Sequence, residues 1–357
     1  MNKKRILSIA LVLTVLLFTA QTAVYAGESG KTGSTSSVRV AFLDTGISTL
    51  YIDASNVAAG QNYVFPQNNT TDRVGHGTAT ASLVLGSVKL GIDGSCSSAT
   101  AVPLVVYDTY ISGVAKYGGS AMMTEAIYDA IDTYGCRVIN MSIGIATDSD
   151  ELRKAVEYAE SKGVVIVSSV GNDNLETPDA AYYPASYPTV IGVGSANGDV
   201  AADFSQRGDS VFLLADGYHL KTATNQVGKK TKLLSGTSYS AAIVSGVVAS
   251  MLTECSSLTP ADVREILSKS CVDVMAEGRD NDSGYGKLDS SRAVAAATAV
   301  AGGLSVSEAI AKVSVEAGNE AVSASQGSAN GENMLAELLV RLINTANAAR
   351  SSIAGVN

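Results

Sequence analysis

The sequence LSGTSYSAA at residues 234–242 delivers Ser238 to the start of a predicted apolar helix, which runs from Ala241 to Leu252. A serine at a helix N-terminus usually caps the helix by accepting a backbone hydrogen bond. A serine that follows Gly and Thr and precedes small residues can instead be a nucleophile presented at a tight turn. Such a nucleophile needs a base and an acid from elsewhere in the chain.

The candidates for the base are few, because the chain has 2 histidines. His76 lies between two glycines at a predicted helix start, where other backbone can approach closely. His219 lies near a polar hairpin around Gly228 and is predicted to be a surface residue. Asp44 follows the first apolar strand, 38–43, and is the candidate acid. Each residue alone could be a cap, but the acid, base and nucleophile all occupy glycine-bounded turns, which favours a shared site.

Apolar runs alternate with predicted helices along the chain. The strands are predicted at 38–43, 101–107, 137–143, 164–170, 190–194 and 211–214, and the helices at 75–86, 124–134, 151–162, 241–252 and 260–269. Apolar strands that alternate with helices indicate a parallel sheet covered on both faces. The sequence therefore predicts an α/β fold, a three-layer αβα arrangement with a mostly parallel central sheet. Functional groups should lie at the carboxyl ends of its strands, where Asp44, Ser142 and Asn172 fall.

The first residues have the pattern of a secretion signal. Lys3-Lys4-Arg5 precedes an apolar run at 6–20, and Val24-Tyr25-Ala26 fits a cleavage site. The run is short for a membrane-spanning helix. Residues 1–26 are therefore predicted to be a cleaved signal peptide of a secreted, extracellular protein that has no membrane partner after cleavage.

Charge excludes some partners, and the cysteines suggest cross-links. The formal net charge is −9, which disfavours nucleic acid as a partner. An even number of cysteines in an exported chain favours disulfides. Cys255 and Cys271 follow two successive predicted helices. A disulfide that closes the loop between them would stabilise the fold by roughly 3 kcal/mol. The predicted disulfides are Cys255–Cys271 and Cys96–Cys136, with free buried thiols as the alternative.

The composition divides the chain into further parts. Residues 27–37 are predicted to be a flexible linker, and residues 38–300 to be the catalytic domain. Residues 301–357 are predicted to be a C-terminal helical extension, an Ala/Ser/Gly-rich linker followed by an amphipathic helix. That helix, at 334–349, has an apolar stripe at helical spacing. It would either dock on the domain or associate with a partner or a second copy.

From about Val38 to about Ala297 the chain resembles the subtilisin-like (subtilase) serine peptidases. The segments that carry the resemblance are, in order, VAFLDTGI, GHGTATAS, VINMSIG, VSSVGN, YPASYPTVIGVGS, DFSQRG, SGTSYSAA and GYGKLD. The chain order Asp, His, Ser is also that of subtilisin. The resemblance implies a secreted serine endopeptidase that works through an acyl-enzyme, without a cofactor, on unfolded or flexible polypeptide.

The same resemblance implies a role for each site residue. Ser238 would be the nucleophile, His76 the general base and then acid, and Asp44 the carboxylate that orients the histidine. Asn172 matches the side-chain donor to the oxyanion. Ser142-Ile143-Gly144 matches the edge segment that pairs with an extended substrate.

Specificity is weakly indicated by the sequence. By the resemblance, Tyr182 would line the floor of the primary pocket, and a bulky floor favours small substrate side chains. Asp173 and Glu176 could instead place negative charge at the rim and favour Lys or Arg. The segment Ser87-Val88-Lys89 replaces the calcium loop common in the family, so no metal site is predicted.

Two further departures leave alternatives open. Ala79 stands where the family usually has a second histidine, which predicts changed helix packing rather than lost chemistry. Residues 27–37 are too few for the family's usual prodomain, which suggests unaided folding or a narrow-specificity processing protease.

The competing functions are a non-catalytic homologue that binds peptides and an esterase, although an esterase would be expected to have G-x-S-x-G at the serine.

Overall fold

The structure is a computed structural model that describes residues 37–109, 115–178 and 180–315, all within one compact unit. The predicted signal peptide, nearly all of the predicted linker at 27–37 and the predicted helix at 334–349 lie outside the described residues. Among the helices of the described ranges, none has the length and hydropathy needed to cross a bilayer.

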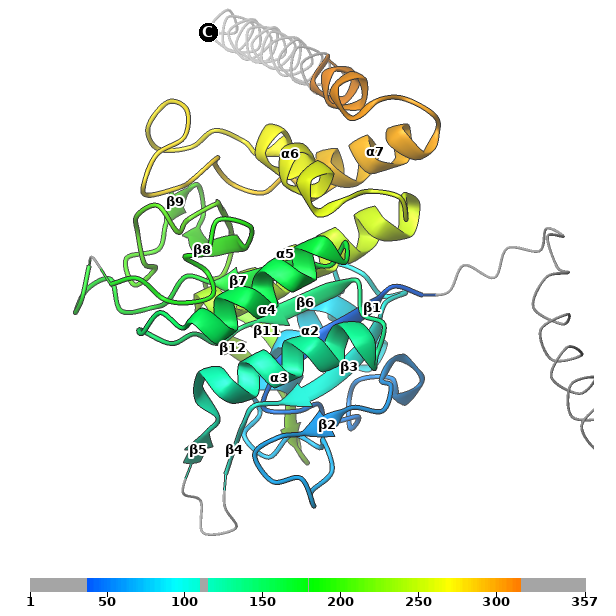
Figure 1. The fold of residues 1–357 in the computed structure, drawn as a ribbon, viewed down its shortest axis with the longest axis vertical. Coiled ribbons are helices and arrows are strands. Elements are labelled where there is room, and N and C mark those ends of the chain that lie inside the picture. Colours follow the sequence, from blue (N-terminus) through cyan, green and yellow to red (C-terminus); the bar gives the residue numbers. More distant parts are fainter. Residues whose placement is uncertain (1–36, 110–114, 179, 316–357) are drawn as a thin grey trace, which may run out of the picture. The chain divides into compact units, whose positions relative to one another are not determined.

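A mostly parallel sheet forms the middle of this unit (Figure 1). Its order is β10-β8-β7-β6-β1-β3-β2, all paired in parallel, and the short β9 pairs antiparallel with β8. The strands are β1 Arg39–Asp44, β2 Gln61–Asn62, β3 Thr100–Val105, β6 Val138–Met141, β7 Val165–Ser169, β8 Ile191–Asn197, β9 Val200–Ala201 and β10 Leu213–Asp216. Two hairpins lie outside the sheet: β4 Tyr107–Thr109 with β5 Ala115–Tyr117, and β11 Leu220–Gln226 with β12 Lys229–Leu234.

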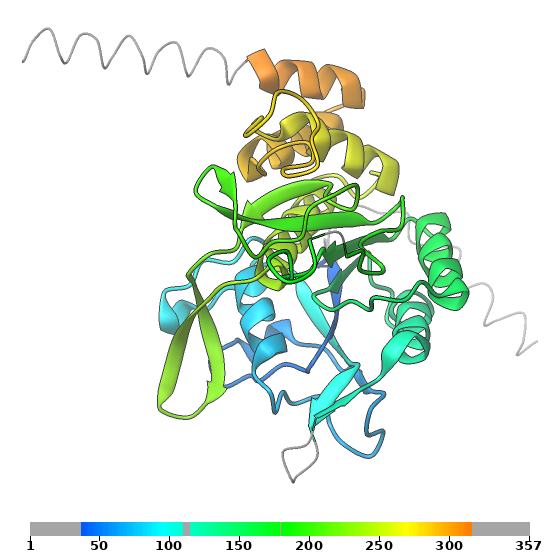
Figure 2. The same cartoon turned by 90° about the vertical axis from the view of Figure 1, so that its left-hand side faces the viewer.

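Helices cover both faces of the sheet (Figure 2). The helices are α2 His76–Leu85, α3 Gly119–Asp132, α4 Asp150–Ser161, α5 Thr237–Glu254, α6 Pro260–Ser270 and α7 Ser290–Ala301. Two 3-10 turns, η1 Ala54–Asn56 and η2 Val88–Leu90, lie in loops. Along β1, Val40 and Phe42 pack with α2 and α5, whereas Ala41 and Leu43 pack with α3 and α4. This alternation follows from the two-residue period of a strand, and it confirms the predicted three-layer arrangement.

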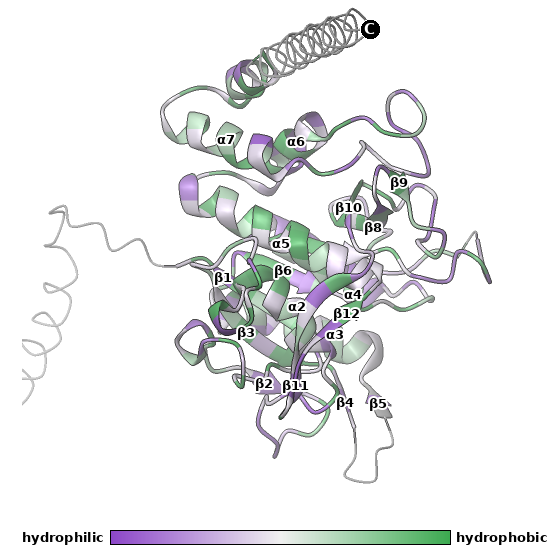
Figure 3. Ribbon diagram, turned by 180° about the vertical axis from the view of Figure 1, so that it is seen from behind, coloured by the Kyte–Doolittle hydropathy of each residue, from purple (hydrophilic) through white to green (hydrophobic). Residues whose placement is uncertain are grey.

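The helix α5 crosses the middle of the unit and is buried on almost every side. Its residues are small or apolar around the whole circumference, as expected for a helix enclosed by a sheet and other helices. Figure 3 shows these hydrophobic colours on α5 and on the strands beneath it. Because the first turn of α5 contains Ser238, the buried body of the helix fixes the position of the candidate nucleophile.

The two predicted disulfides are wrong, because all four cysteines are free thiols. Cys96 and Cys136 pack in the core clusters on opposite faces of the sheet. Leu258 N donates to the Cys255 carbonyl at 3.3 Å, which holds Cys255 near the start of α6, whereas Cys271 follows its last residue. A helix of 11 residues is about 16 Å long, well beyond the Cα separation of about 4.4–6.8 Å in a disulfide.

Residues 306–315 form a helix where a linker was predicted. Ser305 begins it with a capping box: Ser305 N donates to Glu308 Oε2 at 2.8 Å, and Glu308 N donates to Ser305 Oγ at 3.3 Å. Ala309 and Val313 are buried in the same core cluster as α5, α6 and α7. The sequence analysis did not place a helix here; it belongs to the predicted C-terminal helical extension, and the Ser-x-x-Glu pattern was the signal for its start.

Candidate active site

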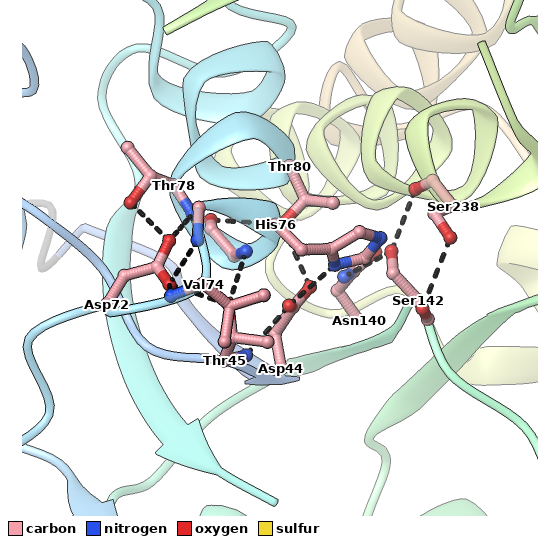
Figure 4. A network of polar contacts seen from close by, with 12 residues as sticks. Asp44, Thr45, Asp72, Val74, His76, Thr78, Thr80, Asn140, Ser142 and Ser238 are labelled. Atoms are coloured by element: carbon pink, nitrogen blue, oxygen red, sulfur yellow. Dashed lines mark hydrogen bonds and ion pairs between the residues drawn. The ribbon is translucent and has the colours of Figure 1, made fainter. Parts of the chain in front are cut away.

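Asp44 and His76 form a close pair at the carboxyl edge of the sheet (Figure 4). Asp44 ends β1 and is 2% exposed, and its Oδ1 lies 2.7 Å from His76 Nδ1. The carboxylate also accepts a hydrogen bond from Thr45 N at 2.7 Å and one from Thr80 Oγ1 at 3.1 Å. These bonds fix the plane of the carboxylate, so that it orients the imidazole from its buried side.

Two glycines allow the His76 turn to approach the Asp44 turn. Gly75 precedes α2 with φ 102°, a left-handed conformation that favours glycine. A Cβ on Gly77 would lie 2.2 Å from the Gly46 carbonyl oxygen, so that a side chain there would push the two turns apart. The glycines on both sides of His76 therefore keep the histidine next to its carboxylate.

Ser238 lies in the first turn of α5, on the other side of the imidazole from Asp44 (Figure 4). It is 9% exposed, and its Oγ donates to the Ser142 carbonyl at 3.2 Å. In return, Ser142 Oγ donates to the Ser238 carbonyl at 2.7 Å. Among the described residues no hydrogen bond joins Ser238 to His76, because the serine hydroxyl is directed to the Ser142 carbonyl in this conformation.

Asn172 is held beside the serine turn by Thr237. Its Oδ1 accepts hydrogen bonds from Thr237 N at 2.9 Å and from Thr237 Oγ1 at 3.0 Å. Because the oxygen is occupied, the amide nitrogen is the free end of the side chain, with no hydrogen-bond partner among the described residues. The backbone N–H of Ser238 is likewise one of the unpaired donors at a helix N-terminus. Two donors are therefore available next to the candidate nucleophile.

Tyr182 lies between the two segments that flank the serine. A Cβ on Gly144 would lie 3.4 Å from Tyr182 Cβ, and one on Gly171 would lie 2.6 Å from the Tyr182 ring. The phenol donates to Asp173 Oδ2 at 2.6 Å, which raises the pKa of Tyr182. Tyr183 N and O bond to the backbone of Ile145 at 2.8 and 2.9 Å and join the 142–145 segment to the tyrosine loop.

The sequence analysis missed Asp72, a buried carboxylate close to His76. Asp72 is 4% exposed, and it accepts hydrogen bonds from Thr45 Oγ1 at 2.8 Å and from Thr78 Oγ1 at 2.6 Å. It also accepts bonds from three backbone N–H groups around the start of α2. Burial raises the pKa of Asp72, and the hydrogen bonds from Thr78 oppose that shift. An Asp three residues before a glycine at a helix start was the available signal.

The pKa of His76 is raised above its ordinary value by opposing effects. Burial favours the neutral imidazole and lowers the pKa, but the charge of Asp44, the hydrogen bond to it and the charge of Asp72 raise it. The His76 side chain is still 31% exposed, so that a ligand can reach the imidazole. The pair can therefore accept a proton on one side while a buried carboxylate stabilises the imidazolium on the other.

The other candidates take no part in this cluster. His219 is exposed and its ring stacks on Tyr218 with centroids 4.1 Å apart. Ala79 is buried between helices of the core, in line with a packing role. Across the described ranges, no group of three or more His, Cys, Asp or Glu residues could hold a metal ion.

Comparison with known proteins finds one family. The family model for the subtilase family matches residues 35–286. The minor extracellular protease Epr of Bacillus subtilis (strain 168) is 30% identical over 269 residues. That match covers 74% of this chain but only 39% of Epr, so that the chain spans about two fifths of that relative.

Solved structures give the same result. The structure of fervidolysin from Fervidobacterium pennivorans, described as a keratinolytic enzyme related to subtilisin, has a TM-score of 0.65 and 29% identity. The match covers 73% of this chain and 43% of the fervidolysin chain. A lanthipeptide protease structure has a TM-score of 0.62 and 25% identity. That match covers 72% of this chain and 86% of the lanthipeptide protease chain.

Proposed function

The chain belongs to the subtilase family of serine peptidases, and from this membership we propose that it is a secreted serine endopeptidase that hydrolyses polypeptides through an acyl-enzyme. One observation carries the proposal. The imidazole of His76 lies between the buried Asp44 carboxylate, 2.7 Å away, and Ser238 at the start of α5. A nucleophile, a base and an orienting acid in this order match the needs of acyl transfer.

The reaction would begin when the Ser238 hydroxyl leaves the Ser142 carbonyl and turns to the free ring nitrogen of His76. Ser238 Oγ attacks the carbonyl carbon of the scissile bond while His76 takes its proton. Asp44 keeps the proton on Nδ1 and stabilises the imidazolium. His76 then gives the proton to the leaving amine, which departs and leaves the acyl-enzyme. Water next attacks the acyl group while His76 takes its proton, and His76 returns that proton to Ser238 Oγ as the carboxylic acid product leaves.

Negative charge that develops on the substrate oxygen would be stabilised by the two free donors beside Ser238. They are the Asn172 amide nitrogen and the Ser238 backbone N–H. Thr237 supports the first donor because its two hydrogen bonds hold the Asn172 oxygen away from the substrate. A donor of this kind is worth about 3–4 kcal/mol of transition-state stabilisation.

The substrate would bind as an extended strand along Ser142-Ile143-Gly144. Main-chain pairing of this kind recognises any unfolded polypeptide and leaves side-chain selection to the pockets. The primary pocket would lie between the walls at Gly144 and Gly171, where Tyr182 occupies the space. Asp173 already accepts a hydrogen bond from the Tyr182 hydroxyl. This contact favours the bulky Tyr182 floor, rather than a free Asp173 charge at the pocket rim, as the determinant of specificity.

A narrow-specificity processing role is consistent with such a filled pocket. The similarity to a lanthipeptide protease supports this proposal, because that enzyme is named for one class of peptide. Secretion is supported by the sequence pattern of residues 1–26 and by the relative named as an extracellular protease. The competing function, peptide binding without cleavage, would be favoured by a missing catalytic residue, but Asp44, His76, Ser238 and Asn172 are all present.

Labelling with a fluorophosphonate probe tests the proposed function. The folded protein is expected to become labelled on Ser238, because only an activated serine attacks the phosphorus. Ser238→Ala should abolish labelling, and Asn172→Leu should slow it by about 10²–10³-fold, since the phosphonyl oxygen occupies the oxyanion position. An unlabelled parent protein, or labelling that survives in Ser238→Ala, would support the non-catalytic alternative.

Replacing Tyr182 with glycine is expected to enlarge the primary pocket. The ratio of kcat/KM for peptides with Phe before the scissile bond over those with Ala should rise by about 10². Tyr182→Phe is the matched control: it keeps the ring but frees Asp173, so the preference for small residues should remain. A gain for Lys or Arg in the Phe variant would instead identify Asp173 as the determinant.

A further inference from the structure

The hairpin β11–β12 carries a concentration of positive charge on an acidic protein. It contains Lys221, Lys229, Lys230 and Lys232, and residues 217–253 include no acidic side chain. The whole chain has a formal net charge of −9. The lysines therefore form a local basic surface within an overall negative field.

The hairpin lies beside the turn that carries His76. Ala223 N donates to Ser82 Oγ of α2 at 3.0 Å, which packs β11 against that helix. Asn225 Nδ2 donates to the Asp72 carbonyl at 3.2 Å, and a Cβ on Gly75 would lie 2.9 Å from Asn225 Oδ1. Figure 2 shows the hairpin next to α2. The tip of the hairpin is thus in contact with the residues just before the candidate base.

The outer strand β12 is open to solvent along most of its length. Residues 226–233 are all exposed, whereas Thr222, Ala223 and Thr224 of β11 are buried. Within the described ranges, β12 pairs with β11 alone, so its second edge keeps unpaired backbone groups. The ammonium groups of Lys229, Lys230 and Lys232 form no hydrogen bond or ion pair with another described residue, although the backbone carbonyls of Lys229 and Lys232 accept hydrogen bonds from β11. Both an extended backbone and negative side chains would find partners here.

We propose that β12 is a docking strand for an acidic, extended segment of the polypeptide substrate, outside the residues that flank the scissile bond. The proposal rests on the proposed protease function and deepens it by naming a substrate class. An extended segment would pair with the free edge of β12, while its Asp or Glu side chains would meet Lys229, Lys230 and Lys232. A docked segment would increase the local concentration of the scissile bond at Ser238.

The charge distribution around the site gives this docking a direction. On the Tyr182 side of the site, Asp173 and Glu176 are exposed and carry negative charge. On the hairpin side, β12 carries the exposed lysines Lys229, Lys230 and Lys232. An acidic segment would therefore be repelled from one end of the site and attracted to the other, which fixes how a polar substrate lies across it.

Lysines on a free edge strand have another common role, which is to prevent edge-to-edge aggregation. That role requires charge but no selectivity for a ligand. The two roles give different results in a binding assay: protection predicts self-association when the lysines are removed, and docking predicts loss of a preference for acidic peptides.

Binding of fluorescent peptides to the Ser238→Ala protein tests the proposal without any need for hydrolysis. The peptides share one central segment and carry a flank of glutamates or glutamines on either side. In the parent background, at least one glutamate-flanked peptide should bind about fivefold or more tightly than its glutamine counterpart at low ionic strength. The preference should decline towards one at about 0.5 M salt, where charges are strongly screened.

The triple change K229Q/K230Q/K232Q should abolish this preference, and K229R/K230R/K232R should retain it. The matched control is K154Q/K269Q/K312Q, which removes the same charge from three exposed lysines on α4, α6 and the helix at 306–315. Size-exclusion chromatography and thermal unfolding confirm that each variant is monodisperse and folded. The proposal is overturned if the parent shows no preference for glutamate, or if the preference persists in the β12 glutamine variant. Fluorophosphonate labelling of the protein with Ser238 intact reports on the protease function separately.

Discussion

Replacing Ser238 with alanine is expected to lower kcat for a peptide substrate by about 10⁶. Alanine lacks the Ser238 Oγ that would form the acyl-enzyme, so that hydrolysis has to proceed by direct attack of water. The backbone is expected to stay in place, because α5 is buried along its length and Ser142 Oγ still donates to the residue 238 carbonyl. The remaining rate would come from binding and from the two oxyanion donors.

The same logic predicts that a second change at His76 adds nothing. His76→Ala alone should cost about as much as Ser238→Ala, and the double variant should be no slower than either, because the two residues act as one unit. Active-site titration of the parent and steady-state kinetics of the three variants measure this. Additive losses of kcat in the double variant would mean that His76 acts on a step other than activation of the serine.

The active-site pair and the serine turn could be predicted from sequence because short motifs encode them. Asp44 ends an apolar strand, and His76 and Ser238 open helices after glycine. The structure brings these three into one cluster because the parallel strands of a sheet end at one edge and α2 and α5 lie on the same face. Their roles in catalysis stay predictions that the labelling and kinetic experiments test.

The support around the site was harder to predict, because it depends on contacts between distant segments. Asp72 accepts hydrogen bonds from Thr45 and Thr78, and Asn172 accepts them from Thr237 across a separation of 65 residues. From the sequence alone, each of these residues would be interpreted as a turn residue or a helix cap. A sequence gives the local preference of such a residue but not which distant donor its oxygen accepts.

The errors have a similar cause. The cysteine count suggested disulfides, but the sheet separates Cys96 from Cys136 and the length of α6 separates Cys255 from Cys271. The helix at 306–315 was missed because its burial depends on distant elements: Ala309 and Val313 pack in the core cluster that contains residues of α5, α6 and α7. The helix α3 begins at Gly119, five residues before the predicted start, because its first three residues, Gly-Ser-Ala, are small and show no apolar periodicity.

Replacing Asp44 with asparagine is expected to lower kcat by about 10⁴ at neutral pH. The carboxylate accepts hydrogen bonds from His76, Thr45 and Thr80, and a carboxamide can accept at only one of its two ends. If the amide nitrogen faces His76, Nδ1 loses its proton and the wrong tautomer is presented to Ser238. If it faces Thr80, the tautomer is kept but the imidazolium loses its negative partner. Both orientations therefore weaken the base.

The pH profile of the surviving activity tests which group sets the pKa of His76. His76 is active as a base only when neutral, so kcat/KM should rise as the pH passes its pKa in the free enzyme. Because the charge of Asp44 and the hydrogen bond to it raise that pKa, Asp44→Asn should move the acidic limb to lower pH. Asp72→Asn, which leaves the hydrogen bond to His76 intact, should move the limb in the same direction by less and cost little in kcat. An acidic limb that stays in place in Asp44→Asn would mean that another group controls it, since neither burial of the imidazole nor the charge of Asp72 changes in that variant.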